Sequence, residues 1–126
     1  MPEPNTPRLK TDQDFVDAHF VNYFKHMQKS VHQTATEKGW HETDRPETEY
    51  IANIHREISE LFDAIAKDDP PDKHCPEFNS SEIEMADVII RLMDWAAQDG
   101  YRLAEAIVAK ARYNQTRSYR HGGKKF

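Results

Sequence analysis

Cysteine is almost missing from this sequence, since Cys75 is the only one among 126 residues. A single cysteine excludes an internal disulfide and fits a reducing, cytoplasmic location. Long apolar runs are missing too, so the sequence predicts no membrane-spanning helix. The N-terminal residues include Pro2, Pro4 and Pro7 but no apolar segment typical of a signal peptide. We therefore expect a cytoplasmic protein without a membrane partner.

Apolar residues are scarce, at 37% of the chain, whereas 31% of the residues are charged. The length leaves room for one domain with one modest hydrophobic core. A single copy with so few apolar residues would be thinly buried. We therefore expect the chain to self-associate and so bury more of its apolar surface.

Acidic residues are missing from the last part of the chain. Residues 106–126 contain six basic residues and no acid, whereas residues 1–105 contain 11 Lys and Arg against 22 Asp and Glu, a balance of 11 − 22 = −11. A basic tail can simply suit a helix C-terminus, or it can form half of a polyphosphate site. With only six cations beside an acidic body, binding to nucleic acid should be weak and salt-sensitive. Nucleic acid is therefore not expected as a partner.

Four segments carry apolar residues at helical spacing, which predicts an all-α fold with a four-helix bundle-like core over residues 12–117. Gly39 and Gly100 are expected to end the first and third helices, and Pro46 to open the second. Proline-rich residues 1–11 predict a flexible arm.

Two further segments are expected outside the helices. Residues 68–80 contain three prolines and predict a loop. Residues 118–126 predict a flexible basic tail.

The helical patterns also predict burial. The second helix is expected to bury one narrow apolar face, made of Ile51, Ile54, Ile58, Leu61, Phe62 and Ile65. The third helix is apolar around most of its circumference and should be buried on nearly all sides. The first helix carries His19, His26 and His32, which have no carboxylate or cysteine at a convincing ligand spacing and are expected at the surface or core edge.

Two pairs of acids stand out, Glu57 with Glu60 and Glu84 with Asp87. A spacing of three places each pair on one side of a helix, so two adjacent helices could aim four carboxylates at one point. Such carboxylates repel one another unless divalent cations lie between them, and oxygen-only ligands favour Mg²⁺ or Mn²⁺. The sequence therefore predicts a metal site made of these four residues.

Structural alternatives remain for these acids. Glu84 could cap the third helix in a pair with Ser81, although Asn79 with Glu82 makes an equivalent capping box. Arg91 shares a polar stripe on that helix with Glu84, Asp87 and Asp94, and could neutralise part of the cluster. A salt-bridge network that involves Arg91 and Arg56 is thus a competing interpretation.

The two acidic pairs are separated by 23 residues and are followed by Lys110, Asn114 and Arg117 at steps of four and three. This arrangement, over roughly residues 40–126, resembles the signature of MazG-like nucleoside triphosphate pyrophosphohydrolases, in the all-α superfamily of NTP pyrophosphatases. The resemblance implies a four-helix core completed as a homodimer or homotetramer. It also implies Mg²⁺-dependent hydrolysis of an NTP or dNTP to the monophosphate and pyrophosphate, with Mn²⁺ as a substitute.

The resemblance implies roles for these residues. Glu57, Glu60, Glu84 and Asp87 would hold the metal, and Lys110, Asn114 and Arg117 would contact phosphate or sugar. From the residues themselves we add two hypotheses. A carboxylate not fully committed to metal, for which we choose Glu60, takes the proton from the attacking water. Trp40, in the loop after Gly39, stacks on the base.

Other classes fit less well. A ferritin-like di-iron protein needs Glu-x-x-His, and an HD-type phosphohydrolase needs adjacent His-Asp; neither occurs in the sequence. The alternative that stays open is a non-catalytic helical bundle that binds nucleotide or nucleic acid as a regulatory protein.

Overall fold

The computed structural model describes residues 11–126, so nearly all of the expected arm at 1–11 lies outside the described residues. The helices are α1 (Asp12–Glu37), α2 (Glu47–Ala66), α3 (Ser80–Asp99), α4 (Leu103–Thr116) and α5 (Arg120–Gly123). They account for 72% of the described residues, and this part of the chain contains no strand, which confirms the all-α prediction. No helix within residues 11–126 is both long and apolar enough to cross a membrane.

The described chain divides into two compact units. Residues 27–101 contain the C-terminal part of α1 together with α2 and α3, and the expected metal ligands all belong to this unit. The second unit contains residues 11–26 and 102–126, and therefore the start of α1 with α4 and α5.

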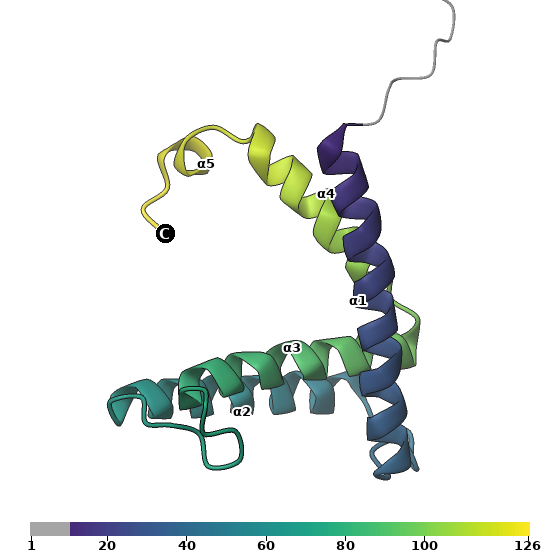
Figure 1. Cartoon of the computed structure of the whole chain (residues 1–126), viewed down its shortest axis with the longest axis vertical. Helices are drawn as coiled ribbons and strands as arrows, with labels where there is room; N and C mark the ends of the chain where they lie inside the picture. The colour runs from purple at the N-terminus through teal and green to yellow at the C-terminus, as the bar shows by residue number, and fades with distance from the viewer. Residues whose placement is uncertain (1–10) are drawn as a thin grey trace, which may run out of the picture. The chain divides into compact units, whose positions relative to one another are not determined.

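Helices α2 and α3 lie side by side in the unit of residues 27–101 (Figure 1). The loop between them is tied to the start of α3, because the Asp69 carboxylate accepts hydrogen bonds from the backbone N–H (2.8 Å) and the hydroxyl (2.5 Å) of Ser81. Inside the loop, the Asp72 carboxylate accepts hydrogen bonds from the backbone N–H groups of His74 and Cys75, both at 2.8 Å. These bonds hold the proline-rich loop against the helix pair.

The helix boundaries follow local chemistry. Gly100 ends α3 with a φ of 74°, a left-handed conformation that glycine adopts without a Cβ penalty. Pro46 directly precedes α2. At the start of α3 the Glu82 carboxylate accepts the Asn79 backbone N–H at 2.8 Å, so Glu82 fills the capping role and Glu84 does not.

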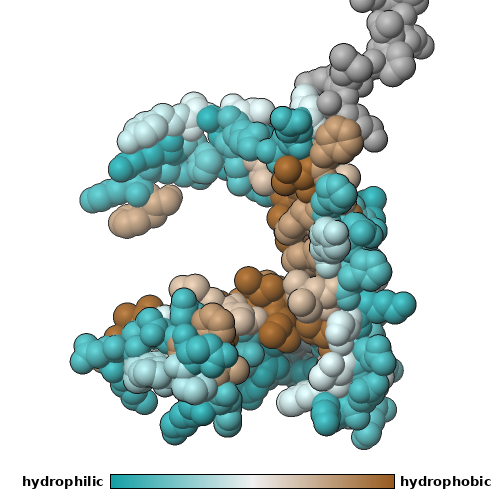
Figure 2. Space-filling view, viewed as in Figure 1, coloured by the Kyte–Doolittle hydropathy of each residue, from teal (hydrophilic) through white to brown (hydrophobic). Residues whose placement is uncertain are grey.

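The prediction of deep burial for α2 and α3 is wrong within one chain. Ile58 and Phe62 of α2 are 47% and 72% exposed, and Ile89 of α3 is 50% exposed. Figure 2 shows hydrophobic surface on this helix pair. The physical reason is that two helices cover only one side of each other. The buried apolar residues of this unit are few, namely Tyr50, Ala64, Met93 and Ala96.

The second unit is held by ion pairs between the start of α1 and α4. The Arg112 guanidinium donates hydrogen bonds to Asp17 at 2.7 Å and to Asp14 at 2.8 Å, and Lys25 lies 3.3 Å from Glu105. Helix α5, within the expected tail, departs from helical geometry at His121 and Gly122, so it is a turn rather than a regular helix.

Candidate functional site: a carboxylate cluster beside a cavity

Three of the expected metal ligands come together between α2 and α3. One carboxylate oxygen each of Glu57, Glu60 and Glu84 can be chosen so that all three lie within 4.8 Å of one another. Glu57 is buried at 4% exposure, Glu84 is half-buried and Glu60 is exposed, so the cluster runs from the helix interface to the surface. Asp87 is outside this group of three, but lines an adjacent cavity together with Glu57.

The electrostatics of the cluster favour protons or cations. Burial, followed by the charges of Glu60, Asp87 and Glu57, raises the pKa of Glu84 to about 7. Hydrogen bonding with Glu57 and then burial raise the pKa of Glu60, and burial followed by the charge of Glu57 raises that of Asp87. Ionisation of Glu60, Glu84 and Asp87 is therefore disfavoured, because like charges are held close together in a partly desolvated place.

Glu84 is the carboxylate of the cluster that most needs a proton or a cation. Its Oε2 atom is buried and has no hydrogen-bond partner among the described residues. A buried carboxylate oxygen without a partner is costly, and most such atoms in proteins are satisfied. The donor set is oxygen only, which is the set that Mg²⁺ and Mn²⁺ prefer. The residues present thus fit a hard divalent cation.

Arg91 neutralises part of the cluster, as the structural alternative anticipated. Its Nε donates a hydrogen bond to Oε1 of Glu57, and the side chains are 25% and 6% exposed. This pair satisfies one oxygen of Glu57 only. Glu60 and Glu84 form no ion pair with a lysine or arginine in the part of the chain that the structure describes.

A cavity of about 270 Å³ lies beside the cluster. Its lining comes from the end of α1, the connection to α2, and the two paired helices: Val31, Thr34, Ala35, Lys38, Trp40, Arg45, Glu57, Asp87, Ile90, Arg91 and Asp94. The lining therefore contains both apolar and charged side chains. The volume is just below the range of small-molecule sites, about 300–1,000 Å³.

Trp40, which the sequence analysis proposed to stack on the base, lines this cavity. The residue is 49% exposed, and the guanidinium carbons of Arg45 and Arg91 lie 5.6 and 6.0 Å from its ring centre. Arg45 has a side chain only 7% exposed, pairs with Glu49 at 3.1 Å, and has an NH2 group that is buried without a partner among the described residues. Trp40 thus gives the cavity an aromatic side chain, with two guanidinium groups beside its ring.

The expected phosphate ligands belong to the other unit. Lys110, Asn114 and Arg117 follow one another along α4 and its C-terminal end, and the first two are exposed. The Lys110 ammonium and the Arg117 guanidinium lie 4.7 and 5.6 Å from the Tyr113 ring centre. They share this aromatic neighbour, and they are not brought together with the carboxylates in one unit.

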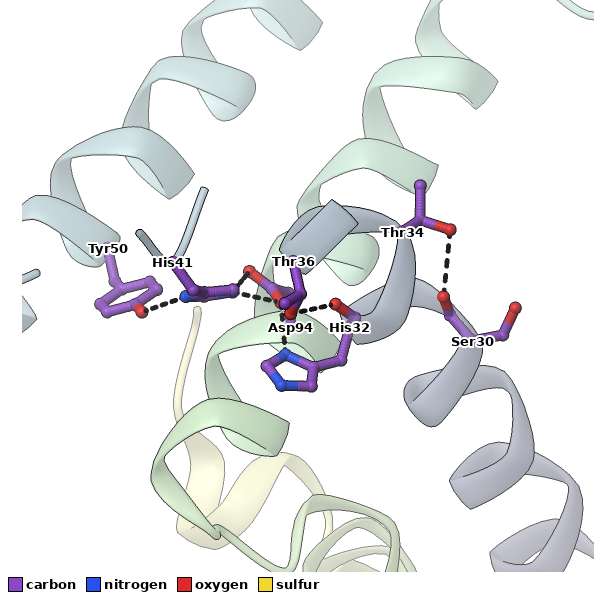
Figure 3. Close-up of polar contacts among 7 residues, drawn as sticks. All are labelled: Ser30, His32, Thr34, Thr36, His41, Tyr50 and Asp94. Atoms are coloured by element: carbon purple, nitrogen blue, oxygen red, sulfur yellow. Dashed lines mark hydrogen bonds and ion pairs between the residues drawn. The ribbon is translucent and has the colours of Figure 1, made fainter. Parts of the chain in front are cut away.

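The sequence reasoning missed a second cluster, made of His32, His41 and Asp94. His32 is half-buried, in agreement with the expected surface or core-edge position, but sequence spacing did not reveal its carboxylate partner: its Nδ1 is 2.9 Å from Oδ1 of Asp94. His41 Nε2 is 2.8 Å from the same oxygen (Figure 3). Asp94 was visible as the last member of the polar stripe on α3, but its partners are 62 and 53 residues away.

Comparison of the chain with protein-family models, curated proteins and solved structures finds no match in any of the three. The function of this chain is therefore inferred from the chemistry of the site.

Proposed function

We propose that this chain is a Mg²⁺-dependent nucleoside triphosphate pyrophosphohydrolase of the MazG-like type, which cleaves an NTP or dNTP to the monophosphate and pyrophosphate. The observation that carries the proposal is the group of Glu57, Glu60 and Glu84 within 4.8 Å, with a buried, unpartnered oxygen on Glu84. Glu60, Glu84 and Asp87 form no ion pair with a lysine or arginine among the described residues, and a cation between the carboxylates would relieve their repulsion.

Glu57, Glu60, Glu84 and Asp87 would hold Mg²⁺, which would supply positive charge against the phosphates and make a nearby water more acidic. The chain itself supplies the ligands and a proton acceptor. Glu60 is exposed and lies at the outer side of the cluster. Its raised pKa suits it to hold the proton of the attacking water at a carboxylate oxygen.

The cavity provides room for the rest of the substrate. Trp40 would stack on the base, and the apolar residues Val31, Ala35 and Ile90 would exclude water around it. Lys110, Asn114 and Arg117 would contact phosphate or sugar, as the resemblance implies.

The fold is proposed to be of the all-α NTP pyrophosphatase type, completed as a homodimer or homotetramer. The support is the apolar surface that one chain leaves open on α2 and α3, including Ile58, Phe62, Met85 and Ile89. Burying such side chains is worth roughly 1.5–3 kcal/mol each. A second copy carries the same surface and could complete a bundle.

The test is a panel of canonical and modified NTPs and dNTPs incubated with the full chain and Mg²⁺, with the products separated. The expected products are a nucleoside monophosphate and pyrophosphate, formed only with Mg²⁺ or Mn²⁺. Release of a diphosphate and inorganic phosphate, or no turnover with any member, would contradict the proposal.

One observation favours the non-catalytic alternative, namely the buried ion pair of Arg91 with Glu57. If the cluster is only a salt-bridge network, the chain should bind nucleotide without turnover. Its binding should also be the same with and without Mg²⁺. The same panel, read by equilibrium dialysis, distinguishes this outcome.

A further inference from the structure

The second cluster has a chemistry different from that of the carboxylates. His32 lies near the end of α1, His41 in the connection to α2, and Asp94 on α3, so the cluster joins three segments of the unit formed by residues 27–101 (Figure 3). Their ligand atoms lie within 4.8 Å of one another. Two imidazoles and one carboxylate are a donor set that favours Zn²⁺ over Mg²⁺.

We propose that His32, His41 and Asp94 form a Zn²⁺ site that ties the end of α1 and the α1–α2 connection to α3. The site is separate from the carboxylate cluster, does not depend on the proposed enzymatic activity, and has the three protein ligands of an open tetrahedral zinc site, with water in the fourth position.

The distances suit this ion. Two imidazoles bound to one tetrahedral Zn²⁺, at about 2.0–2.1 Å per Zn–N bond, have ring centres about 5 Å apart. The ring centres of His32 and His41 are 5.0 Å apart, with an angle of 48° between the planes. Ligand atoms around such an ion are separated by about 3.3 Å. The contacts of Asp94 with the two rings, at 2.8 and 2.9 Å, need only widen slightly.

The surroundings of His41 also match those of a zinc ligand. Its side chain is 5% exposed, and its second ring nitrogen, Nδ1, lies 3.3 Å from the Tyr50 hydroxyl. Metal-bound imidazoles usually donate this second N–H to a fixed acceptor, which orients the ring and leaves the other nitrogen free for the ion. Tyr50 is itself fixed, because it is 6% exposed and stacks on Trp95 at 5.4 Å between ring centres.

The charge of Asp94 supports the same conclusion. Its side chain is 12% exposed, and no lysine or arginine within residues 11–126 forms an ion pair with it. A buried carboxylate needs a positive partner or several hydrogen bonds. The two imidazoles supply hydrogen bonds to its oxygens, and Zn²⁺ would supply positive charge at the point where both rings and the carboxylate meet.

The test uses the full chain, stripped of metal with a chelator and titrated with Zn²⁺ against a chromophoric competitor in the absence of Mg²⁺. We expect one tightly bound Zn²⁺ per chain. His32→Gln and Asp94→Asn should weaken the affinity by more than the roughly 10- to 100-fold that loss of an outer partner costs, and Tyr50→Phe should weaken it within that range. His26→Gln, at an exposed histidine of α1, should leave it unchanged.

Two further measurements keep the outcome decisive. Circular dichroism of each metal-free variant shows whether it folds, and Co²⁺ bound in place of Zn²⁺ should give the visible absorption of a tetrahedral site with nitrogen and oxygen ligands. Glu84→Gln should retain the Zn²⁺ affinity, because it alters only the other cluster. The proposal fails if folded His32→Gln and Asp94→Asn bind Zn²⁺ as tightly as the unchanged chain does. It also fails if no stoichiometric Zn²⁺ binds, in which case the three residues form a hydrogen-bonded cluster without a metal.

Discussion

Stabilisation of the chain by Mg²⁺ should increase steeply as the pH rises, because the cation must displace a proton from Glu84. The pKa of this residue is raised to about 7. A group with that pKa is about 9% ionised at pH 6 and about 91% ionised at pH 8, so the apparent Mg²⁺ affinity should rise about tenfold across this interval from Glu84 alone. Glu60 and Asp87, whose pKa values are also raised, act in the same direction.

The sign follows from the direction of the shift. A carboxyl with a pKa raised by folding stabilises the fold while it is protonated, below its unfolded value of 4.5. That contribution is lost as the pH rises from about 4.5 through about 7. The free energy of unfolding of the metal-free chain should therefore fall between these pH values. Bound Mg²⁺ removes the repulsion, and it does so only where the carboxylates are ionised.

The assay is thermal unfolding followed by circular dichroism, with and without excess Mg²⁺. A tenfold gain in affinity adds about 1.4 kcal/mol of stabilisation once the site is filled, which corresponds to about 5 °C in the Tm of a chain of this size. Glu84→Gln should reduce both this gain and its pH dependence, to which only Glu60 and Asp87 would still contribute. Glu37→Gln removes an exposed carboxylate of α1 and serves as the matched control. An equal effect of Mg²⁺ at both pH values, or an unchanged effect in Glu84→Gln, would refute the reasoning.

Three other expectations concern turnover, the base site and assembly. Glu60→Gln and Asp87→Asn should each lower the rate of pyrophosphate release by at least about 100-fold with helical content retained; unchanged turnover would show that the acids are misassigned. Trp40→Ala should raise KM about tenfold with little change in kcat, since base stacking is worth about 1–3 kcal/mol, and an effect on kcat alone would argue against stacking. Sedimentation equilibrium should find a dimer or tetramer that Phe62→Glu shifts toward the monomer, whereas a monomeric unchanged chain would exclude assembly through this surface.

Local features of the sequence were enough to predict the helices. Gly39, Pro46 and Gly100 act within a few residues of where they stand, so the expected helix ends agree closely with α1, α2 and α3. Burial could not be predicted in the same way. The apolar stripe of α2 shows that a face such as Ile58 and Phe62 seeks a partner, but it does not say whether the partner lies in the same chain.

The candidate site likewise has one part that local spacing predicts and one part that depends on tertiary packing. Sequence spacing identified Glu57 with Glu60 and Glu84 with Asp87 as two pairs, and the pairing of α2 with α3 brings Glu84, but not Asp87, into one group with Glu57 and Glu60. His32 and His41 have no such periodic relation to Asp94. Their contacts depend on how the end of α1 and the following connection lie against α3, which a local pattern does not encode.

The most direct test of the central claim is a count of bound divalent cations. Mn²⁺ can be titrated into the metal-free chain and followed by electron paramagnetic resonance, which distinguishes free from bound ion. We predict at least one tightly bound Mn²⁺ per chain, displaced by Mg²⁺, lost in Glu84→Gln and retained in Glu37→Gln. If Mn²⁺ does not bind tightly, or binds equally well to Glu84→Gln, the carboxylate cluster of α2 and α3 is not a metal site.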